Sequence, residues 1–431
     1  MMKALINARI YDYNQYQEQA YILFDEQITQ VGPMIEFVDN GYDIIDCTGQ
    51  LVMPSLVVGH SHIYSTFARG LSIPFNPQNF QEILAQLWWK LDASLDNSMN
   101  YNSGIASACD FLRNGITTII DHHASGKDII GSLLALKHAI CDDASMRGIF
   151  CFETSDRFNI EACIKENVDF LSLEPTAFSA GMFGLHASMT LSETTLKAVK
   201  QVLKDEPIHI HVAESNEDET DSINQYGERI INRLDRHGLL NPGSIIAHAL
   251  YTDSSELKIL KKRGCVVALN VTSNMNNGVG LPNFEALRHS GVKIIIGNDG
   301  ISSSITTEYL NLYYAAHLKN GINAFNLIDL CKMINDTYQY ANDRLKIKLG
   351  KIQVGYAADL LTIPYHPVTP MDAENAFSHV FFGLYNSFKP SNVFVAGKRV
   401  VKEYQLRPEL QSKYLDVIKA ATRLWNEIKK G

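Results

Sequence analysis

The chain has few cysteines and no paired cysteine motif, and we find no segment typical of a membrane span or a signal peptide. Its 431 residues include seven cysteines, and no two of them are spaced as Cys-x-x-Cys. An odd and scattered set argues against a disulfide framework and against a thiolate zinc site. No apolar run reaches the roughly 18 residues that a membrane span needs, and no basic segment followed by an apolar stretch opens the chain. We therefore expect a soluble, cytoplasmic protein.

Positive charge is also scarce. The chain has 38 lysines and arginines against 47 acidic residues, which gives a formal net charge of −9. Proteins that bind nucleic acids or anionic membranes usually carry a basic patch, so we expect neither partner. Hydrophobic residues make up 46% of the chain, which is enough to bury a large core.

Eight short apolar runs alternate with longer amphipathic stretches between residues 51 and 354. The runs are LVMPSLVVGH, ITTIIDHH, GIFCFET, FSAGMFGLH, PIHIHVAE, SIIAHAL, CVVALNV and VKIIIGND. Apolar residues recur three and four apart in 131–147, 191–204, 221–237 and 255–263, the spacing of amphipathic helices. Eight strands alternating with helices predict an α/β fold, a parallel (β/α)₈ TIM barrel over residues 51–354.

The two ends of the chain differ from this middle part. Residues 1–50 and most of 355–405 are rich in short β-like runs separated by turn residues, and a helix is expected near 408–429. We expect residues 1–50 and 355–431 to form one small β-sandwich domain beside the barrel, with the last helix included.

Histidines and carboxylates stand where four of the predicted barrel strands end. His60 and His62 are two residues apart at the end of the first strand, so both imidazoles point to the same side. His211 ends the fifth strand, and Glu214 follows it. Imidazole is a common ligand of zinc and similar divalent metals, and a free carboxylate beside an activated water is what proton transfer requires.

Two further strands add to this set. His248 ends the sixth strand and Asp299 the eighth. Each alone has an ordinary explanation, a loop histidine or an aspartate that caps a helix. Together, however, these residues fall at the carboxyl ends of strands one, five, six and eight, where barrel enzymes have their active sites. His209 shares a face with His211 one layer deeper, and we interpret it as barrel filling.

This order of motifs resembles the amidohydrolase superfamily, in its ATZ/TRZ and cytosine deaminase-like branch. The supporting segments are MPSLVVGHSHIYSTFARGL, HIHVAES, IIAHAL, SNMNNGVG, GNDG and VGYAADLLTI. Other stretches, among them LWWKLDASLD and CFETSDR, resemble SsnA-type aminohydrolases. The resemblance implies a metal held by His60, His62, His211 and Asp299, with Glu214, His248 and Asp299 as catalytic groups. The chain departs from the family's usual pattern at Pro54-Ser55 and Gly59, which affects loop shape more than chemistry.

The expected cofactor is one divalent metal ion, zinc before iron. Binuclear relatives often use a carboxylated lysine at the end of strand four, and that strand has no lysine here. Glu153, at the end of strand three, could bridge two metals, as a carboxylate does in some relatives. We favour a single metal, with Glu153 as an outer metal contact or a substrate contact.

Candidate substrate contacts are Arg69, Arg157, His186 and Asn274. The two arginines could clamp an anionic group through paired hydrogen bonds, or they could be ordinary salt-bridge residues. Trp88 or Trp89 could stack on a planar ring, although core packing is the more common role of such a residue.

The sequence thus predicts a metal-dependent aminohydrolase that releases ammonia from a small nitrogen-rich, heterocyclic substrate. Two alternatives remain: the same fold could remove a different leaving group, by opening a ring amide or by dechlorination, or the chain could be a catalytically silent metal-binding relative. By analogy with relatives we expect a homo-oligomer, a dimer or larger.

Overall fold

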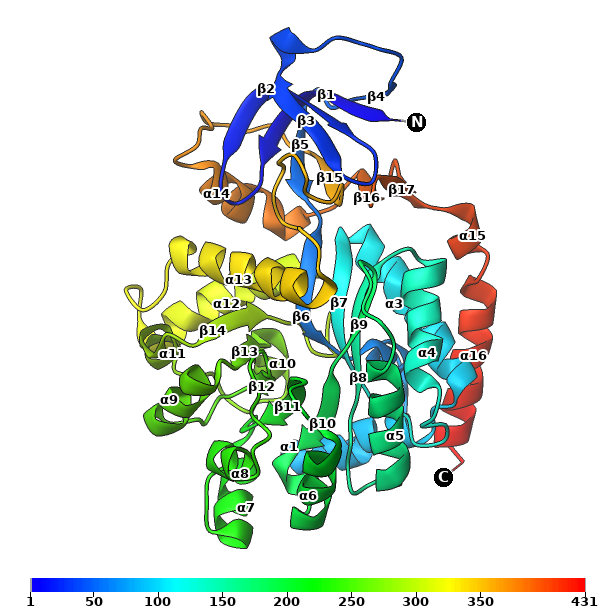
Figure 1. Cartoon of the computed structure of the whole chain (residues 1–431), viewed down its shortest axis with the longest axis vertical. Coiled ribbons are helices and arrows are strands. Elements are labelled where there is room, and N and C mark those ends of the chain that lie inside the picture. Colours follow the sequence, from blue (N-terminus) through cyan, green and yellow to red (C-terminus); the bar gives the residue numbers. More distant parts are fainter. Residues whose placement is uncertain (1, 431) are drawn as a thin grey trace.

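A computed structural model describes residues 2–430, and its central part is built from two parallel sheets (Figure 1). The first sheet contains four strands, in the order β6 (Leu56–Ser61), β7 (Ile116–His123), β8 (Arg147–Phe152) and β9 (Ser179–Gly181). The second contains five, β10 (Phe183–Ala187), β11 (Ile208–Val212), β12 (Ile245–His248), β13 (Val266–Leu269) and β14 (Lys293–Ile296). Parallel bridges between Thr154 and Leu185 and between Ser61 and Asp299 connect the two sheets.

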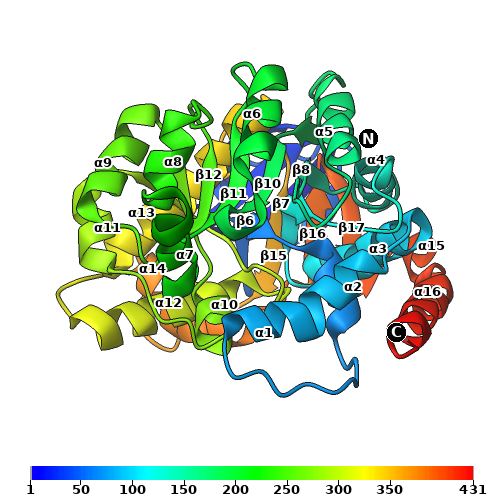
Figure 2. The same cartoon turned by 90° about the horizontal axis from the view of Figure 1, so that it is seen from below.

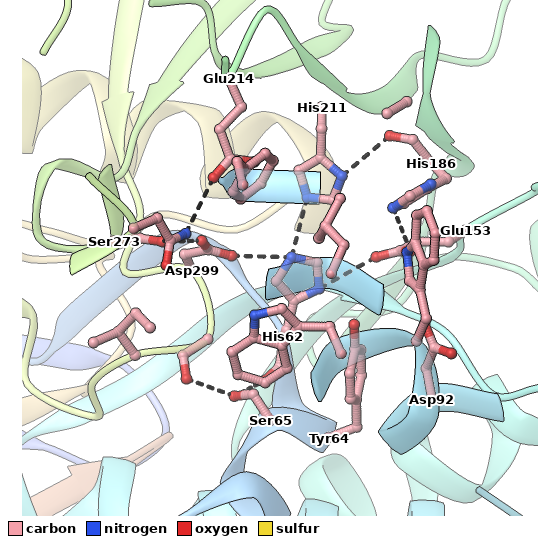
Figure 3. Close-up of a pocket in the computed structure, with 18 of the residues that line it drawn as sticks. His62, Tyr64, Ser65, Asp92, Glu153, His186, His211, Glu214, Ser273 and Asp299 are labelled. Carbon is pink, nitrogen blue, oxygen red and sulfur yellow. Dashed lines mark hydrogen bonds and ion pairs between the residues drawn. The ribbon is translucent and has the colours of Figure 1, made fainter. Parts of the chain in front are cut away.

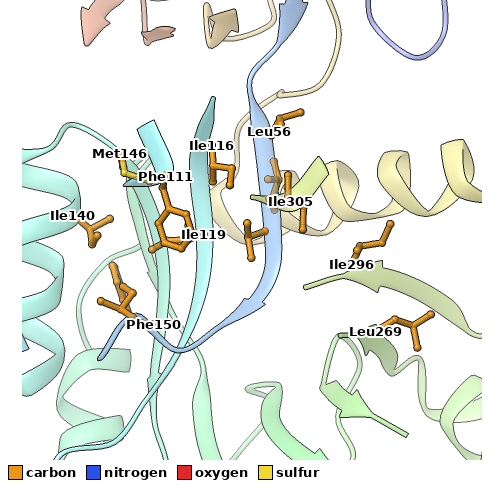
Figure 4. Close-up of a cluster of buried hydrophobic side chains, with 14 of the residues drawn as sticks. Leu56, Phe111, Ile116, Ile119, Ile140, Met146, Phe150, Leu269, Ile296 and Ile305 are labelled. Carbon is orange, nitrogen blue, oxygen red and sulfur yellow. The ribbon is translucent and has the colours of Figure 1, made fainter. Parts of the chain in front are cut away.

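Helices cover these strands, as the alternating pattern predicts. The main ones are α3 (Asn97–Arg113), α4 (Ser132–Lys137), α5 (Ile160–Leu171), α6 (Glu193–Val202), α7 (Asn216–Tyr226), α8 (Ile230–Arg236), α9 (Ser254–Arg263), α10 (Val271–Asn276), α11 (Phe284–Ser290), α12 (Ile305–Asn320) and α13 (Leu327–Leu345). All eight residues of β7 are buried, because a parallel sheet covered by helices has no solvent face. Figure 4 shows the packing of Leu56, Ile119 and Phe150 in this core.

Three predicted elements are divided in the structure. The fourth predicted strand is two strands, β9 and β10, which belong to different sheets. The expected helix over 221–237 is two helices, α7 and α8, because Gly227 adopts a left-handed φ of 74° that ends the first. The first predicted strand is also two: β5 (Gln50–Pro54) belongs to another sheet, and β6 begins at Leu56. The parallel strands therefore start at residue 56, slightly after the expected boundary at 51.

The chain ends combine into a nine-stranded sheet at the top of Figure 1. Its other strands are β1 (Lys3–Tyr11), β2 (Tyr16–Phe24), β3 (Ile28–Pro33), β4 (Asp43–Asp46), β15 (Leu360–Pro364), β16 (Asn392–Val395), β17 (Lys398–Lys402) and β18 (Gln405–Leu406). Antiparallel pairing of β5 with β15 joins the two ends of the chain. Hydrogen bonds connect all nine strands into one sheet, whereas we expected a sandwich of two.

The last helix, α16 (Tyr414–Ile428), lies along α3 rather than on this sheet (Figure 1). Arg423 forms an ion pair of 2.8 Å with Asp96, and the Trp425 indole N–H donates to the Phe67 carbonyl at 2.7 Å. The helix thus packs against the parallel-sheet part of the molecule. Over residues 2–430, no helix combines the length and hydropathy of a membrane span.

Candidate metal centre and pocket

The histidines and carboxylates singled out in the sequence meet at the carboxyl ends of the parallel strands. One ligand atom each from His60, His62, His211 and Asp299 lie within 4.8 Å of one another. The Nε2 atoms of His62 and His211 are 3.0 Å apart, and Asp299 Oδ1 is 3.0 Å from His62 Nε2 (Figure 3). Asp299 Oδ1 is also 3.6 Å from His60 Nε2. Four donor atoms therefore surround one small volume.

Hydrogen bonds on the far side of each imidazole leave Nε2 free. His62 Nδ1 donates to the His122 carbonyl at 2.6 Å, and His211 Nδ1 donates to the His186 carbonyl at 3.1 Å. A carbonyl can only accept, so in the neutral ring Nδ1 carries the proton and Nε2 has a free lone pair. This is the tautomer that binds a metal, with its outer nitrogen held by a second group.

His60 is oriented by another histidine. Its Nδ1 lies 2.8 Å from His209 Nε2, and both rings are fully buried. His60 Nε2 is also buried and has no hydrogen-bond partner. An orphaned imidazole nitrogen facing two others and a carboxylate fits a borderline divalent cation such as zinc. His209, which we interpreted as filling, is thus in contact with this set.

The backbone is strained where two of these side chains are placed. His248 has a φ of 71° and Asp299 a φ of 54°, a region that residues other than glycine seldom adopt and that is frequent at functional sites. Gly297 permits the close approach of this loop, since a Cβ there would lie 2.7 Å from His60 Cβ. The Ser273 hydroxyl donates to Asp299 Oδ2 at 2.5 Å and fixes the carboxylate.

Glu214 and His248 form a pair beside the four donors. Glu214 Oε2 is 3.4 Å from His248 Nε2, and the Asn277 amide donates to Glu214 Oε1 at 3.4 Å. Burial, reinforced by the charge of Asp299, raises the pKa of Glu214 well above its ordinary value. Glu214 can therefore hold a proton near neutral pH.

Asn274 was expected to contact the substrate, but it lies behind His248. Its amide is 2.9 Å from His248 Nδ1, and it does not line the pocket. An amide N–H that donates to Nδ1 leaves the proton of a neutral His248 on Nε2, the atom that faces Glu214.

The four donor atoms lie at one side of a pocket. The empty space within it, open solvent at the entrance included, is about 760 Å³. Its lining is His62, Tyr64, Ser65, Phe80, Leu84, Trp88, Trp89, Asp92, Glu153, His186, Ala187, Met189, His211, Glu214, Asp218, Ser273, Asn277, Asp299, Gly300 and Ile301. His186 and both tryptophans thus reach the pocket.

Glu153 lies among three imidazoles. Its carboxylate oxygens are 3.3 Å from His62 Nδ1, 3.2 Å from His122 Nδ1 and 3.7 Å from His186 Nε2. Burial raises the pKa of Glu153, but the imidazoles of His186 and His122 outweigh it and hold the pKa well below its ordinary value. Glu153 is therefore an ionised group that contacts the ring of His62.

The two arginines expected to clamp a substrate anion do not line this pocket. Arg69 is 67% exposed in its side chain and pairs with Asp110 at 2.8 Å. Arg157 places both of its contacts to Asp92 within 2.8 Å and stacks on Trp89. Both guanidinium groups are thus engaged with acidic residues of the chain, an outcome that sequence spacing does not reveal.

The sequence is similar to one family of enzymes and to deaminases within it. The model of the amidohydrolase family matches residues 51–400. The 5′-deoxyadenosine deaminase of Methanopyrus kandleri is 27% identical over 90% of this chain and 91% of its own. The 5-methylthioadenosine/S-adenosylhomocysteine deaminase of Thermococcus sibiricus is 25% identical over 88% of each chain.

Solved structures share the fold over almost the whole length. A zinc-bound adenosine deaminase from Xanthomonas campestris superposes with a TM-score of 0.82 at 20% identity, covering 99% of this chain and 98% of its own. The zinc complex of an atrazine chlorohydrolase from Arthrobacter aurescens TC1 gives 0.80 at 19% identity, covering 98% and 99%. At these identities the likeness concerns the fold, an α/β architecture with an additional domain.

Proposed function

The chain belongs to the amidohydrolase family, and from that premise we propose that it is a metal-dependent deaminase acting on the amino group of an adenine-type heterocycle. The observation that carries the proposal is the convergence of four donor atoms within 4.8 Å beside a Glu214–His248 pair, at the base of a pocket. The similarity to deaminases of 5′-deoxyadenosine and 5-methylthioadenosine supports the substrate class.

One zinc ion would be held by His60, His62, His211 and Asp299. When bound, such an ion supplies the Lewis acidity that makes water nucleophilic near neutral pH. The free Nε2 atoms and the buried, unpartnered nitrogen of His60 support this ligand set. The lack of a lysine in β10, FGLHA, supports one ion rather than two.

The chain's own residues would move the protons. Asp299 accepts a proton from the attacking water, and Ser273 keeps its carboxylate in position. Glu214, protonated because its pKa is raised, delivers a proton to the ring nitrogen next to the amino-bearing carbon. His248, held by Asn274, orients the water and then stabilises the developing charge. The proton held by Asp299 then passes to the departing amino group, and the new hydroxyl returns its proton to Glu214. Water thus replaces the amino group, ammonia leaves, and both carboxyl groups regain their starting states.

Other pocket residues would hold the ring. Trp88 and Trp89 line the pocket, and an indole stacks well on a planar heterocycle. His186 Nδ1 is 2.7 Å from the Thr190 hydroxyl, which fixes the orientation of the ring. The other ring nitrogen would donate or accept a hydrogen bond with the substrate at the pocket wall.

The wider organisation follows from the same proposal. The two parallel sheets would form one closed (β/α)₈ barrel, with residues 1–50 and 355–431 as the composite second domain. All seven cysteines are free thiols, six of them buried, which supports a reducing compartment such as the cytoplasm. The homo-oligomer stays a prediction.

The test is an ammonia-release assay on protein loaded with one equivalent of zinc. The substrates are 5′-deoxyadenosine, adenosine, cytosine and a chlorinated triazine, with chloride measured for the last. We expect ammonia from the adenine nucleosides. The Glu214→Gln variant should lose about 10²–10⁴-fold in turnover while keeping its metal content, since this residue is not among the four ligands.

Glu217→Gln is the matched control, because Glu217 is exposed in the first turn of α7 and lies outside the pocket. It should retain wild-type turnover. Full activity of Glu214→Gln would refute the proton-transfer role, and chloride release without ammonia would favour the dechlorinating alternative.

A further inference from the structure

A second pocket adjoins the donor set. It lies between the helical turn Ile63–Ala68, α3 and residues 300–303, and we call it the side pocket. Its empty space, open solvent at the entrance included, is about 820 Å³. His62 and Asp299, two of the four donors, line both the side pocket and the pocket shown in Figure 3, which we call the substrate pocket. The donors therefore stand at the junction of two pockets.

The side pocket extends from the buried donors to the surface of the molecule. At its inner end the side chains of His62 and Asp299 are only 10% and 13% exposed. At its outer end the side chain of Arg69 is 67% exposed, and Asn276 is exposed as well. The donors thus have a second opening to solvent besides the mouth of the substrate pocket.

The side pocket is rich in hydroxyl groups, which belong to Ser61, Ser65, Thr66, Ser107, Ser302 and Ser303. Ser61, Ser65 and Ser107 already donate to backbone carbonyls within the chain. Their oxygens therefore present lone pairs, which accept hydrogen bonds from the N–H groups of ammonia or the O–H groups of water. Such a lining suits small polar molecules.

Ser65 and Gly300 form part of the wall between the two pockets, because both residues line each of them. The Ser65 hydroxyl donates to the Gly300 carbonyl at 2.8 Å. A Cβ at residue 300 would lie 2.8 Å from Ser65 Cβ, so glycine permits this close contact. Figure 3 shows Ser65 below His62 and Asp299, at the edge of the substrate pocket. Only a thin wall separates the two pockets beside the donors.

The other way out of the substrate pocket passes under a short helix. Figure 2 shows α1 (Phe80–Ile83) crossing the face of the molecule beside α2 (Trp89–Ala93) and α10. The Gln81 amide donates to Asp221 of α7 at 3.4 Å, so α1 is tied across to α7. A nucleoside bound beneath α1 would fill the space between the donors and the mouth. Ammonia formed beside Asp299 would then be held back until the heterocyclic product had left.

We propose that the side pocket is a separate passage through which ammonia leaves and water enters while the heterocyclic product is still bound. This inference rests on the proposed deaminase activity and adds the order of product release. The amino group departs beside Asp299, which lines the side pocket, and ammonia moves outward along the hydroxyl groups. The deaminated heterocycle leaves later by the mouth under α1. The next water reaches the donors through the side pocket.

The experiment plugs the side pocket with a bulky side chain. Ala68→Phe and Ser303→Phe each add a ring at a residue that lines the side pocket and not the substrate pocket. Zinc-loaded protein, shown to be folded by circular dichroism, is mixed rapidly with 5′-deoxyadenosine. Conversion of the heterocycle is followed by absorbance, first over a single turnover and then at steady state.

Both plugged variants should lose about tenfold or more in kcat while keeping kcat/KM within about twofold, because product release follows the chemical step. Their first turnover should be as fast as that of wild type, which gives a burst of about one equivalent of product before the slow phase. A loss caused only by a disturbed structure would not leave the first turnover intact.

Two controls separate the plug from other effects of substitution. Ser303→Ala removes the same hydroxyl without adding bulk, and Ala85→Phe adds the same ring at an exposed residue that lines neither pocket. Both should match wild type in kcat and in the first turnover. A plugging effect that either control reproduces would contradict the passage.

Wild-type kcat in either folded plugged variant would overturn the inference and leave the deaminase intact. Equal losses of kcat and kcat/KM would also overturn it, because they would place the effect at binding or at the chemical step. If the wild-type protein releases no ammonia from any adenine nucleoside, the proposed function fails and this inference fails with it.

Discussion

His209 provides the sharpest test of how the metal site is held. Its Nε2 lies 2.8 Å from His60 Nδ1, and neither ring has any exposed area. Burial lowers the pKa of His209 well below its ordinary value, so the ring stays neutral. In the tautomer with its proton on Nδ1, which lies 3.6 Å from Cys151 Sγ, His209 Nε2 accepts from His60 Nδ1. The free nitrogen of His60 then faces the other three donors.

Replacing His209 with leucine should weaken zinc binding by about 10–100-fold, the usual effect of removing an outer hydrogen-bond partner of a ligand histidine. That factor equals roughly 1.4–2.7 kcal/mol. The structure gives the same range independently, because a buried N–H left without its partner costs about 1–3 kcal/mol. His209→Gln, which keeps an acceptor, should lose less.

The assay is a competition titration of zinc against a chelator of known affinity, on protein shown to be folded by circular dichroism. Ile210→Val is the control, since Ile210 is equally buried in β11 but its side chain points to the other face of the strand. It should lose some stability and no zinc affinity. A His209→Leu protein that binds zinc within threefold of wild type would refute the reasoning.

Two further predictions concern stability. Arg147→Met should lower the free energy of unfolding, measured with denaturant, by about 3–5 kcal/mol. It leaves Asp359 as an uncompensated buried charge between β8 and β15. Arg9→Met breaks the more exposed pair with Glu18 and should cost at most about 1 kcal/mol. Partial burial raises the pKa of Glu193, but hydrogen bonds from Arg233 and His237 outweigh it and lower the pKa to about 2. A carboxyl group whose pKa is lower in the folded protein than in the unfolded chain stabilises the fold at pH values above the unfolded pKa, and this stabilisation is lost as the pH falls to the folded pKa. Wild type should therefore be more stable than Glu193→Gln at neutral pH and should lose that advantage between about pH 4.5 and 2.

Each stability prediction has an outcome that contradicts it. Equal losses for Arg147→Met and Arg9→Met would mean that the buried pair has no special role. A difference between wild type and Glu193→Gln that stays constant from pH 7 to pH 2 would show that the pKa of Glu193 is not lowered in the folded protein.

Much of the parallel core could be predicted because its signals are local. Every apolar run contains a strand, and His60, His62, His211, His248 and Asp299 meet because the carboxyl ends of the parallel strands lie on one face. The family resemblance inferred from those motifs is confirmed by the match over residues 51–400.

The remaining features depend on partners far apart in the sequence. No local pattern shows that Arg157 is hydrogen-bonded to Asp92, 65 residues away. The sequence alone therefore suggested an anion clamp, whereas Arg157 does not line the pocket. The role of His209 was missed because an inward-pointing histidine in a strand is ambiguous until its neighbour is known. Ser273 and Asn277 could have been suspected from the polar run TSNMNN, which follows β13, but only the fold directs them to Asp299 and Glu214.

The central claim is that His60, His62, His211 and Asp299 hold one catalytic divalent ion. The most direct measurement removes bound metal with a chelator and restores zinc stepwise, while ammonia release from 5′-deoxyadenosine is followed. We predict that activity disappears on removal and returns in full at one equivalent per chain. Undiminished activity without metal, or a requirement for two equivalents, would contradict the account.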